Sequence, residues 1–283
     1  MEFTEQLRVE VQRSVAASLA EDIGTGDLTA RLIPASRNAR GRVITREEAV
    51  LCGTAWFDAT FAALEPDASV IWHARDGERL KPGQLLCEVD ASARARLTAE
   101  RTALNFIQLL SGTATLTATF VAAVAGTKAK IVDTRKTLPG LRLAQKYAVR
   151  VGGGTNHRVG LYDGILIKEN HIIAAGSIKA VIEQARSYAP SNVFIEVEVE
   201  DLAQLDEALA AGAKMILLDN MDLDQMRAAV ALNDGRAELE ASGGVNLERV
   251  RAIAETGVDR ISIGSLTKDL RAIDLSLRHV EEE

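Results

Sequence analysis

The stretch that decides the fold runs from Asp133 to His171, with the motifs DTRKTLPGLR at 133–142, GGGTNHRVGLYD at 152–163 and IKENH at 167–171. Apolar runs at 131–132 and 165–167 predict two short buried strands. α/β folds bind ligands at the carboxyl ends of their parallel strands. The polar residues after both runs are therefore expected at one mouth of the sheet.

Basic residues follow these strands and the glycine-rich turn between them: Arg135, Lys136, Arg158 and Lys168. The glycines at 152–154 permit positive φ and a close approach of the backbone, so these cations can converge. Cations held at one mouth repel one another, and a strongly anionic ligand is the simplest explanation for such a cluster.

Strands and amphipathic helices alternate after Gly126, which predicts a parallel sheet with helices between its strands. Candidate strands cover 130–133, 164–168, 194–199, 215–219, 237–241 and 260–264. About six strands are too few for a complete eight-stranded barrel.

Acidic residues and glycines end the later strands. Alternation along 194–199 places Glu196 and Glu198 on one face, and Asp219 ends the next strand. Glu198 and Asp219 can accept hydrogen bonds from ribose hydroxyls or reach Mg²⁺ through water, while salt bridges to a lysine are the alternative for both glutamates. Glycines that precede helix starts leave N–H groups free for a phosphate monoester, although plain tight turns would read the same. These loops contain Ser242, Gly243, Gly244 and Gly264.

The first part of the chain has a different pattern. A helix is predicted over 1–20, short strands within 41–51 and 70–89, and a helix over 98–124 that Gly112 is expected to break or bend. We predict an N-terminal α+β domain over 1–112 and a barrel over 113–266. The apolar period after Thr267 predicts a C-terminal helix over 267–283 that packs back on the N-terminal domain and ends in three solvated glutamates.

Two features of the N-terminal part have competing interpretations. Its strands resemble a biotinyl carrier, but Lys81 lacks the sequence context of a modified lysine. The acidic turn at 21–29 lacks a full calcium ligand set, which favours helix capping.

Composition excludes other classes of function. A formal net charge of −7 argues against general nucleic-acid binding. Cys52 and Cys87 lie far apart without metal-ligand spacing, so free buried thiols are expected. We find no signal peptide or membrane span in the sequence, and we expect a cytoplasmic enzyme.

The three motifs of the deciding stretch resemble those of the quinolinate phosphoribosyltransferase family, also called carboxylating nicotinate-nucleotide pyrophosphorylases. The likeness extends from about Glu21 to Leu277. It implies a type II phosphoribosyltransferase fold: an incomplete α/β barrel of about six or seven parallel strands with an N-terminal α+β sandwich domain. It also implies transfer of phosphoribosyl from phosphoribosyl pyrophosphate to quinolinate with decarboxylation, which gives nicotinate mononucleotide for NAD synthesis.

The resemblance also implies the site. Arg101, on spacing alone a solvated helix residue, would reach the active site of a neighbouring subunit, so a homodimer or higher oligomer is expected. Mg²⁺ would be held by substrate pyrophosphate and water near Glu198 and Asp219, without direct protein ligands. Lys168 or His157 could supply the final proton. Quinolinate would contact Arg101, Arg135, His157, Arg158 and Lys168. The other implied substrate-binding residues are Thr134, Lys136, Glu198, Asp219, Ser242, Gly243, Gly244 and Gly264, and the catalytic ones are Lys136, Lys168, Glu198 and Asp219.

Three rival functions fit part of the pattern. A related pyrophosphorylase of the same fold could act on another base. A Schiff-base aldolase could use Lys168 at a strand end. A non-catalytic phosphate-binding protein would need the glycine loops but no turnover.

Overall fold

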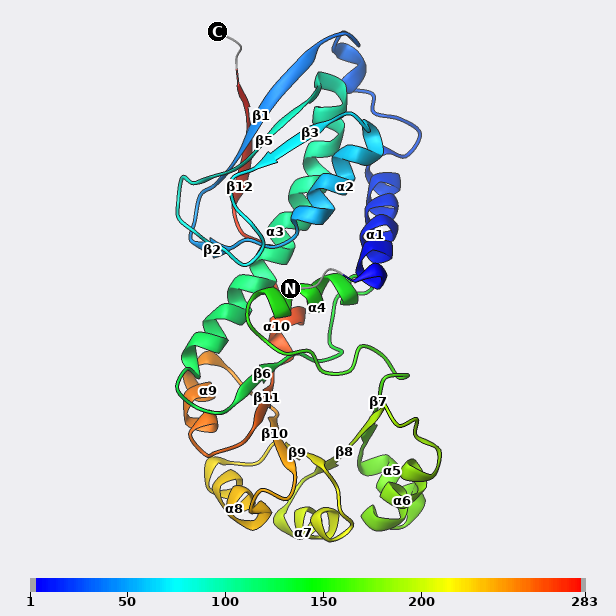
Figure 1. Cartoon of the computed structure of the whole chain (residues 1–283), viewed down its shortest axis with the longest axis vertical. Coiled ribbons are helices and arrows are strands. Elements are labelled where there is room, and N and C mark those ends of the chain that lie inside the picture. The colour runs from blue at the N-terminus through cyan, green and yellow to red at the C-terminus, as the bar shows by residue number, and fades with distance from the viewer. Residues whose placement is uncertain (1–3, 281–283) are drawn as a thin grey trace. The chain divides into compact units, whose positions relative to one another are not determined.

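A computed structural model describes residues 4–280 of the chain (Figure 1). The chain forms two compact units: 1–118 with 138–153 and 269–283, and 119–137 with 154–268. These ranges differ from the predicted 1–112 and 113–266 mainly because residues 138–153 belong to the first unit. Helix α4 (Arg142–Val151) buries Ala144, Tyr147 and Ala148 in the core of that unit, which explains the insertion.

The first unit contains an antiparallel sheet of strand order β12-β1-β5-β3 and a small β2-β4 pair. Its strands are β1 (Asn38–Thr45), β2 (Ala49–Val50), β3 (Ser69–Trp72), β4 (Arg79–Leu80), β5 (Leu85–Ser92) and β12 (Leu275–Val280). Its helices are α1 (Glu5–Ile23), the short η1 (Ala30–Leu32), α2 (Thr54–Leu64), α4 and most of α3 (Ala93–Ala123). Residues of β1 alternate between buried and exposed, so one face of the sheet packs on a core that includes Phe57, Phe61, Leu86 and Ile107.

Helix α3 runs without interruption through Gly112, where the sequence predicts a break or bend. By length and composition alone this helix could cross a membrane, but half of its most apolar window is buried. Ile107 packs in one core cluster of the first unit and Leu110 in the other. The apolar character of α3 is therefore explained by its place in the core.

Gly112 permits a close approach of the C-terminal segment to α3, because a Cβ atom there would collide with the carbonyl oxygen of Arg271. Gly→Ala in a helix normally stabilises by about 1 kcal/mol. Here we expect Gly112→Ala to lower the free energy of unfolding by about 1–3 kcal/mol, as overpacking does. Urea unfolding measures it, with Asn105→Ala on an exposed position of α3 as the control. A stabilised Gly112→Ala variant would contradict this packing.

The C-terminal segment is a strand and not the predicted helix. β12 pairs antiparallel with β1, with Leu277 opposite Val43. Ile273, Leu275 and Leu277 also fit a two-residue period, and the free backbone groups at the β1 edge favour the strand. The segment does pack on the first unit as predicted, whereas the acidic end at 281–283 lies outside the described residues.

The second unit is a parallel sheet of strand order β6-β11-β10-β9-β8-β7, with helices on its outer side (Figure 1). Its strands are β6 (Lys130–Val132), β7 (Gly164–Ile167), β8 (Phe194–Val199), β9 (Met215–Asp219), β10 (Glu238–Ser242) and β11 (Arg260–Ser262). Its helices are α5 (Glu169–Ala175), α6 (Ile178–Tyr188), α7 (Leu202–Ala210), α8 (Leu223–Asn233), α9 (Leu247–Ala254) and α10 (Ser265–Lys268). β6 and β7 are the two edges of the sheet, so the predicted incomplete α/β barrel is confirmed.

Short capped connections keep the strand ends close to the helix starts. Asp201, Asp222 and Asn246 are the N-caps of α7, α8 and α9, and each side chain accepts a backbone N–H from the first turn of its helix. The polar residues at the ends of β8, β9 and β10 are therefore held at the mouth by rigid elements.

Candidate active site

A cavity of about 240 Å³ opens at the carboxyl ends of the parallel strands. Two larger cavities, one against the N-terminal sheet and one at the amino ends of β10 and β11, contain none of the predicted site residues. The predicted residues that line the mouth cavity are Thr134, Arg135, Lys136, His157, Arg158, Lys168, Glu198, Asp219 and Ser242. The sequence interpretation did not assign a role to Asp133, Leu166, Leu217, Glu240 and Ser262, which complete the lining.

The cations converge as predicted. Burial, together with the positive charge of Arg135, lowers the pKa of Arg158 below its usual value. The Arg158 guanidinium donates to the Gly164 carbonyl oxygen at 3.1 Å. Lys168 Nζ lies 2.9 Å from Glu198 Oε2, and its side chain is 52% exposed. An anion in the cavity would relieve the repulsion between the two guanidinium groups.

The segment 155–158 is anchored to the end of β6. Thr155 N–H donates to the Ile131 carbonyl oxygen at 2.8 Å, and Val132 and Thr155 form a parallel bridge. Buried Asp133 accepts from His157 N–H at 2.8 Å and from the Asn156 amide at 2.6 Å. The two motifs that the sequence separates by a helix are thus fixed side by side.

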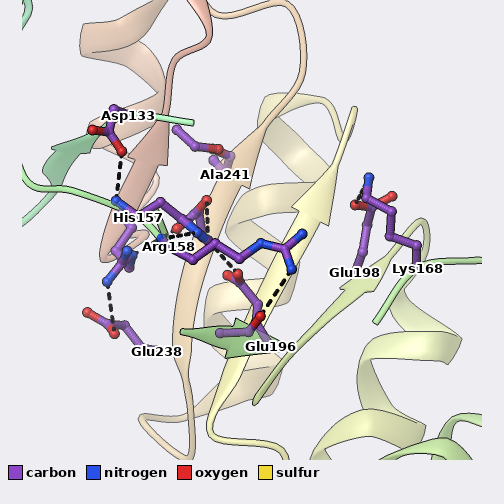
Figure 2. Close-up of polar contacts among 12 residues, drawn as sticks. Asp133, His157, Arg158, Lys168, Glu196, Glu198, Glu238 and Ala241 are labelled. Atoms are coloured by element: carbon purple, nitrogen blue, oxygen red, sulfur yellow. Dashed lines mark hydrogen bonds and ion pairs between the residues drawn. The ribbon is translucent and has the colours of Figure 1, made fainter. Parts of the chain in front are cut away.

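His157 lies over a buried acidic cluster (Figure 2). Its Nε2 is 2.7 Å from Glu196 Oε2 and 3.8 Å from Glu240 Oε1, while its Nδ1 accepts the backbone N–H of Arg158 at 2.8 Å. Arg260 Nε donates to Glu240 Oε2 at 2.8 Å. Burial, and then the negative charge of Glu196, raises the pKa of Glu240.

The imidazole and the two carboxylates are close enough to hold a metal ion. A metal ion there would have to displace the hydrogen bond between His157 and Glu196. It would also have to compete with the Arg260 guanidinium for Glu240. His157 Nε2, Glu196 Oε2 and Glu240 Oε2 are therefore already engaged, whereas Glu196 Oε1 and Glu240 Oε1 are buried without a hydrogen-bond partner among the described residues. The sequence signal for this cluster is the presence of glutamates inside the strands β8 and β10. The sequence did not predict a role for Glu240.

The ends of β9 and β10 are linked through Asn220. Its side-chain amide donates to Asp219 Oδ2 at 2.9 Å, and its backbone N–H donates to the Ser242 carbonyl oxygen at 3.0 Å. Gly243 has φ +98°, and a Cβ atom there would collide with the Asn220 side chain. Asn220 thus ties the end of β9 to the glycine loop after β10.

Gly264 and Arg101 complete the predicted set. A Cβ atom on Gly264 would lie 3.0 Å from Lys136 Cδ, so this glycine gives the lysine room. The Lys136 carbonyl oxygen accepts from Thr267 Oγ1 at 2.8 Å. Arg101 lies on α3 in the first unit and is exposed. The cavity lining comes from the second unit alone.

Comparisons with known proteins agree with this arrangement. Models of the quinolinate phosphoribosyl transferase N-terminal and C-terminal domains match residues 27–111 and 113–278. The probable carboxylating nicotinate-nucleotide pyrophosphorylase of Bacillus subtilis is 45% identical over 257 residues, which cover 91% of this chain and 89% of the relative. The Mycobacterium leprae enzyme of the same name is 46% identical over 274 residues, with 93% and 95% covered. The solved structure of the nicotinate-nucleotide pyrophosphorylase from Francisella tularensis matches with a TM-score of 0.94 and 46% identity, covering 96% of this chain and 97% of that one. The chain belongs to the quinolinate phosphoribosyltransferase family.

Proposed function

We propose that the mouth cavity binds quinolinate through Arg135, Arg158 and Lys168 and phosphoribosyl pyrophosphate beside Glu198 and Asp219. The chain is a carboxylating nicotinate-nucleotide pyrophosphorylase, which forms nicotinate mononucleotide, pyrophosphate and carbon dioxide in de novo NAD synthesis. The observation that carries the substrate assignment is that two arginine side chains line one cavity, where the positive charge of Arg135 contributes to lowering the pKa of Arg158. A dicarboxylate matches their charge, and a guanidinium group can donate two parallel N–H groups to a carboxylate.

The first chemical step joins the pyridine nitrogen to the anomeric carbon. The bond from that carbon to the pyrophosphate oxygen breaks, and pyrophosphate leaves with the electron pair. Positive charge develops on the ribose, and Glu198 and Asp219 would stabilise it from the ends of β8 and β9. Lys136, at the same mouth, would contact the phosphates. The glycine turn at Gly243 and Gly244 would take the 5-phosphate.

The second step removes the 2-carboxylate. The ring nitrogen is now cationic, so it stabilises the carbanion that remains at carbon 2 after carbon dioxide leaves. A proton then adds to carbon 2 and completes the nicotinate ring. Ion pairs to the departing carboxylate stabilise the ground state, so some of them must weaken along the path. The Lys168 side chain is about half exposed and its Nζ pairs with Glu198, so we expect its contact with the substrate to be the one that weakens.

We further propose Mg²⁺ as the cofactor. Oxygen donors suit this ion, and Glu198 and Asp219 both present carboxylates to the cavity. Lys168 already engages Oε2 of Glu198, which favours contact with the ion through water and substrate pyrophosphate. When bound, Mg²⁺ would neutralise charge on the leaving pyrophosphate.

A homodimer that shares Arg101 is also proposed. Exposed Leu97 lies about one turn before Arg101 on α3, and Leu28 and Leu32 are 76% and 80% exposed. The Thr98 hydroxyl donates to Asp27, which ties that segment to the same helix. An apolar surface around an exposed arginine supports an interface that a second copy covers.

Mixing two inactive variants tests the shared site. Arg101→Ala and Lys168→Ala homodimers should each lack one residue in every site, whereas a mixed dimer contains one intact site. After random subunit exchange of equal amounts, about a quarter of wild-type activity is expected, because half the dimers are mixed and each restores one of two sites. Exchange of Arg101→Ala with an Arg101→Ala/Lys168→Ala double variant should restore nothing. If the first mixture recovered no activity, Arg101 would not be shared between subunits.

The activity itself is tested with purified protein. Release of pyrophosphate and carbon dioxide should require quinolinate, phosphoribosyl pyrophosphate and Mg²⁺ together. Turnover of nicotinate but not quinolinate would favour a related pyrophosphorylase for another base. Borohydride trapping of Lys168 with a carbonyl substrate should yield no adduct, since Lys168 Nζ is paired with Glu198.

The cytoplasm is the proposed location. Cys52 and Cys87 are both free and buried, as thiols are in a reducing compartment. Plant relatives include proteins named mitochondrial and chloroplastic, so the family also works in organelles.

A further inference from the structure

We propose that His157 is a positioning residue that fixes Arg158 and gives no proton to the substrate, and that Glu196, Glu240 and Arg260 are its buried support. The inference rests on the proposed function, because it assigns a role within that site. It carries two consequences: the proton that follows decarboxylation comes from elsewhere, and three residues outside the substrate contacts control quinolinate binding.

The hydrogen bonds at His157 define its tautomer. Nδ1 accepts the backbone N–H of Arg158 at 2.8 Å, and a ring nitrogen that accepts carries no proton. The ring proton therefore lies on Nε2, which is 2.7 Å from Glu196 Oε2. In this arrangement neither ring nitrogen offers a proton to the cavity.

The groups around the imidazole hold it from several elements. Asp133 at the end of β6 accepts the His157 backbone N–H, and Phe194 on β8 meets the ring edge-on with centroids 5.4 Å apart. Glu196 on β8 and Glu240 on β10 lie at 2.7 Å and 3.8 Å from Nε2. The neighbouring positive group is Arg158, the next residue in the sequence. The charge of Arg135 contributes to lowering the pKa of Arg158. The imidazole is thus clamped between the acids and the arginine backbone.

Burying the two carboxylates of Glu196 and Glu240 costs free energy that their partners must offset. Glu196 and Glu240 are 0% and 1% exposed, and burying carboxylates is unfavourable without strong partners. Arg260, from β11, pairs with Glu240, and His157 bonds Glu196. Polar contacts from β11, β10 and β8 therefore meet at the imidazole of His157. Through Nδ1 it sets the backbone from which the Arg158 guanidinium enters the cavity.

Asparagine and alanine at position 157 separate positioning from proton donation. The Oδ1 atom of asparagine can take the place of Nδ1 and accept the Arg158 N–H, but its amide supplies no proton near neutral pH. We expect His157→Asn to retain kcat within about threefold. His157→Ala leaves that partly buried N–H without its acceptor, and we expect it to raise KM for quinolinate by about 10- to 100-fold. An acid role would instead lower kcat in both variants by about 100-fold or more, which would overturn the proposal.

The support residues give a second kinetic contrast. Glu196→Gln keeps an acceptor for the Nε2 proton and should resemble wild type in KM for quinolinate. Glu196→Leu removes the acceptor and should raise that KM as His157→Ala does, with KM for phosphoribosyl pyrophosphate unchanged. If Glu196→Gln and Glu196→Leu behaved alike, the hydrogen bond to His157 would have no positioning role.

Nitrogen-15 NMR of histidine-labelled protein provides a readout independent of turnover. The His157 resonances, assigned by their loss in His157→Asn, should show an unprotonated Nδ1 and a protonated Nε2 at neutral pH. Protonation of both nitrogens would contradict the assignment. A protein that fails to turn over quinolinate but shows this tautomer would lose the proposed function while the hydrogen-bond arrangement stands.

Discussion

Replacing Arg158 by alanine is expected to lower kcat/KM for quinolinate by about 100- to 1000-fold. Removing one partner of a desolvated charge pair costs about 2–5 kcal/mol, and each 1.4 kcal/mol is a factor of ten. Arg158 is partly buried beside Arg135, so its charge is strongly felt by an anion in the cavity. Binding of phosphoribosyl pyrophosphate should change by less than about threefold, because that substrate is expected at other strand ends. Steady-state kinetics and calorimetry measure the two effects separately.

Arg158→Lys is the informative companion variant. Lysine keeps the positive charge but cannot present two parallel N–H groups to a carboxylate, so an intermediate loss is expected. Arg227→Ala is the matched control, since Arg227 is an exposed arginine on α8 that pairs with Asp224. Equal losses for both substrates in Arg158→Ala would indicate a damaged fold, and wild-type quinolinate kinetics would remove the cation cluster from the mechanism.

Local patterns were sufficient to predict the second unit. Each strand there is short and either ends in a polar residue or is followed by one, and residues such as Asp201 and Asp222 mark the following helix starts. Because parallel strands share one carboxyl edge, residues as distant as Arg135 and Asp219 could be assigned to one mouth. The cavity confirms that convergence.

Features that depend on distant partners were not predictable. The sequence gives no reason for a buried Glu240 within β10, because its partners His157 and Arg260 are placed beside it only by the topology. The periodicity after Thr267 fits a helix and a strand alike, and only the open edge of β1 decides. Gly112 suggests a break in the helix when the sequence is read locally. The reason for a glycine there is the close approach of the Arg271 carbonyl oxygen, which lies far along the chain. In all three cases the missing information was a contact between remote segments.

Gly243→Ala is expected to raise KM for phosphoribosyl pyrophosphate by about 10- to 100-fold. A φ of +98° is strained for alanine, at about 1–3 kcal/mol, and the new Cβ would also collide with Asn220. Relief of that collision would move the Asn220 amide away from Asp219, which loses its 2.9 Å hydrogen bond. One substitution would thus disturb both the phosphate loop and the carboxylate expected at the ribose.

Gly235→Ala separates backbone strain from this collision. Gly235 has φ +73°, and nothing lies within 4 Å of a Cβ atom added there. It should therefore show a strain cost in unfolding without a change in KM for phosphoribosyl pyrophosphate. KM for quinolinate should stay within about threefold of wild type in both variants, because Arg158 and Arg135 lie on other elements.

The double variant Gly243→Ala/Asn220→Gly distinguishes the collision from a simple need for glycine. Asn220 has φ +53°, a conformation that glycine adopts freely, so removal of its side chain takes away the two closest contacts of the new Cβ atom without new strain, while the backbone nitrogen stays at 3.1 Å. Part of the lost affinity for phosphoribosyl pyrophosphate should return, although Asp219 would still lack its hydrogen bond. A double variant as weak as Gly243→Ala alone would place the whole effect in the loop backbone and leave Asn220 no role in linking Asp219 to the phosphate loop.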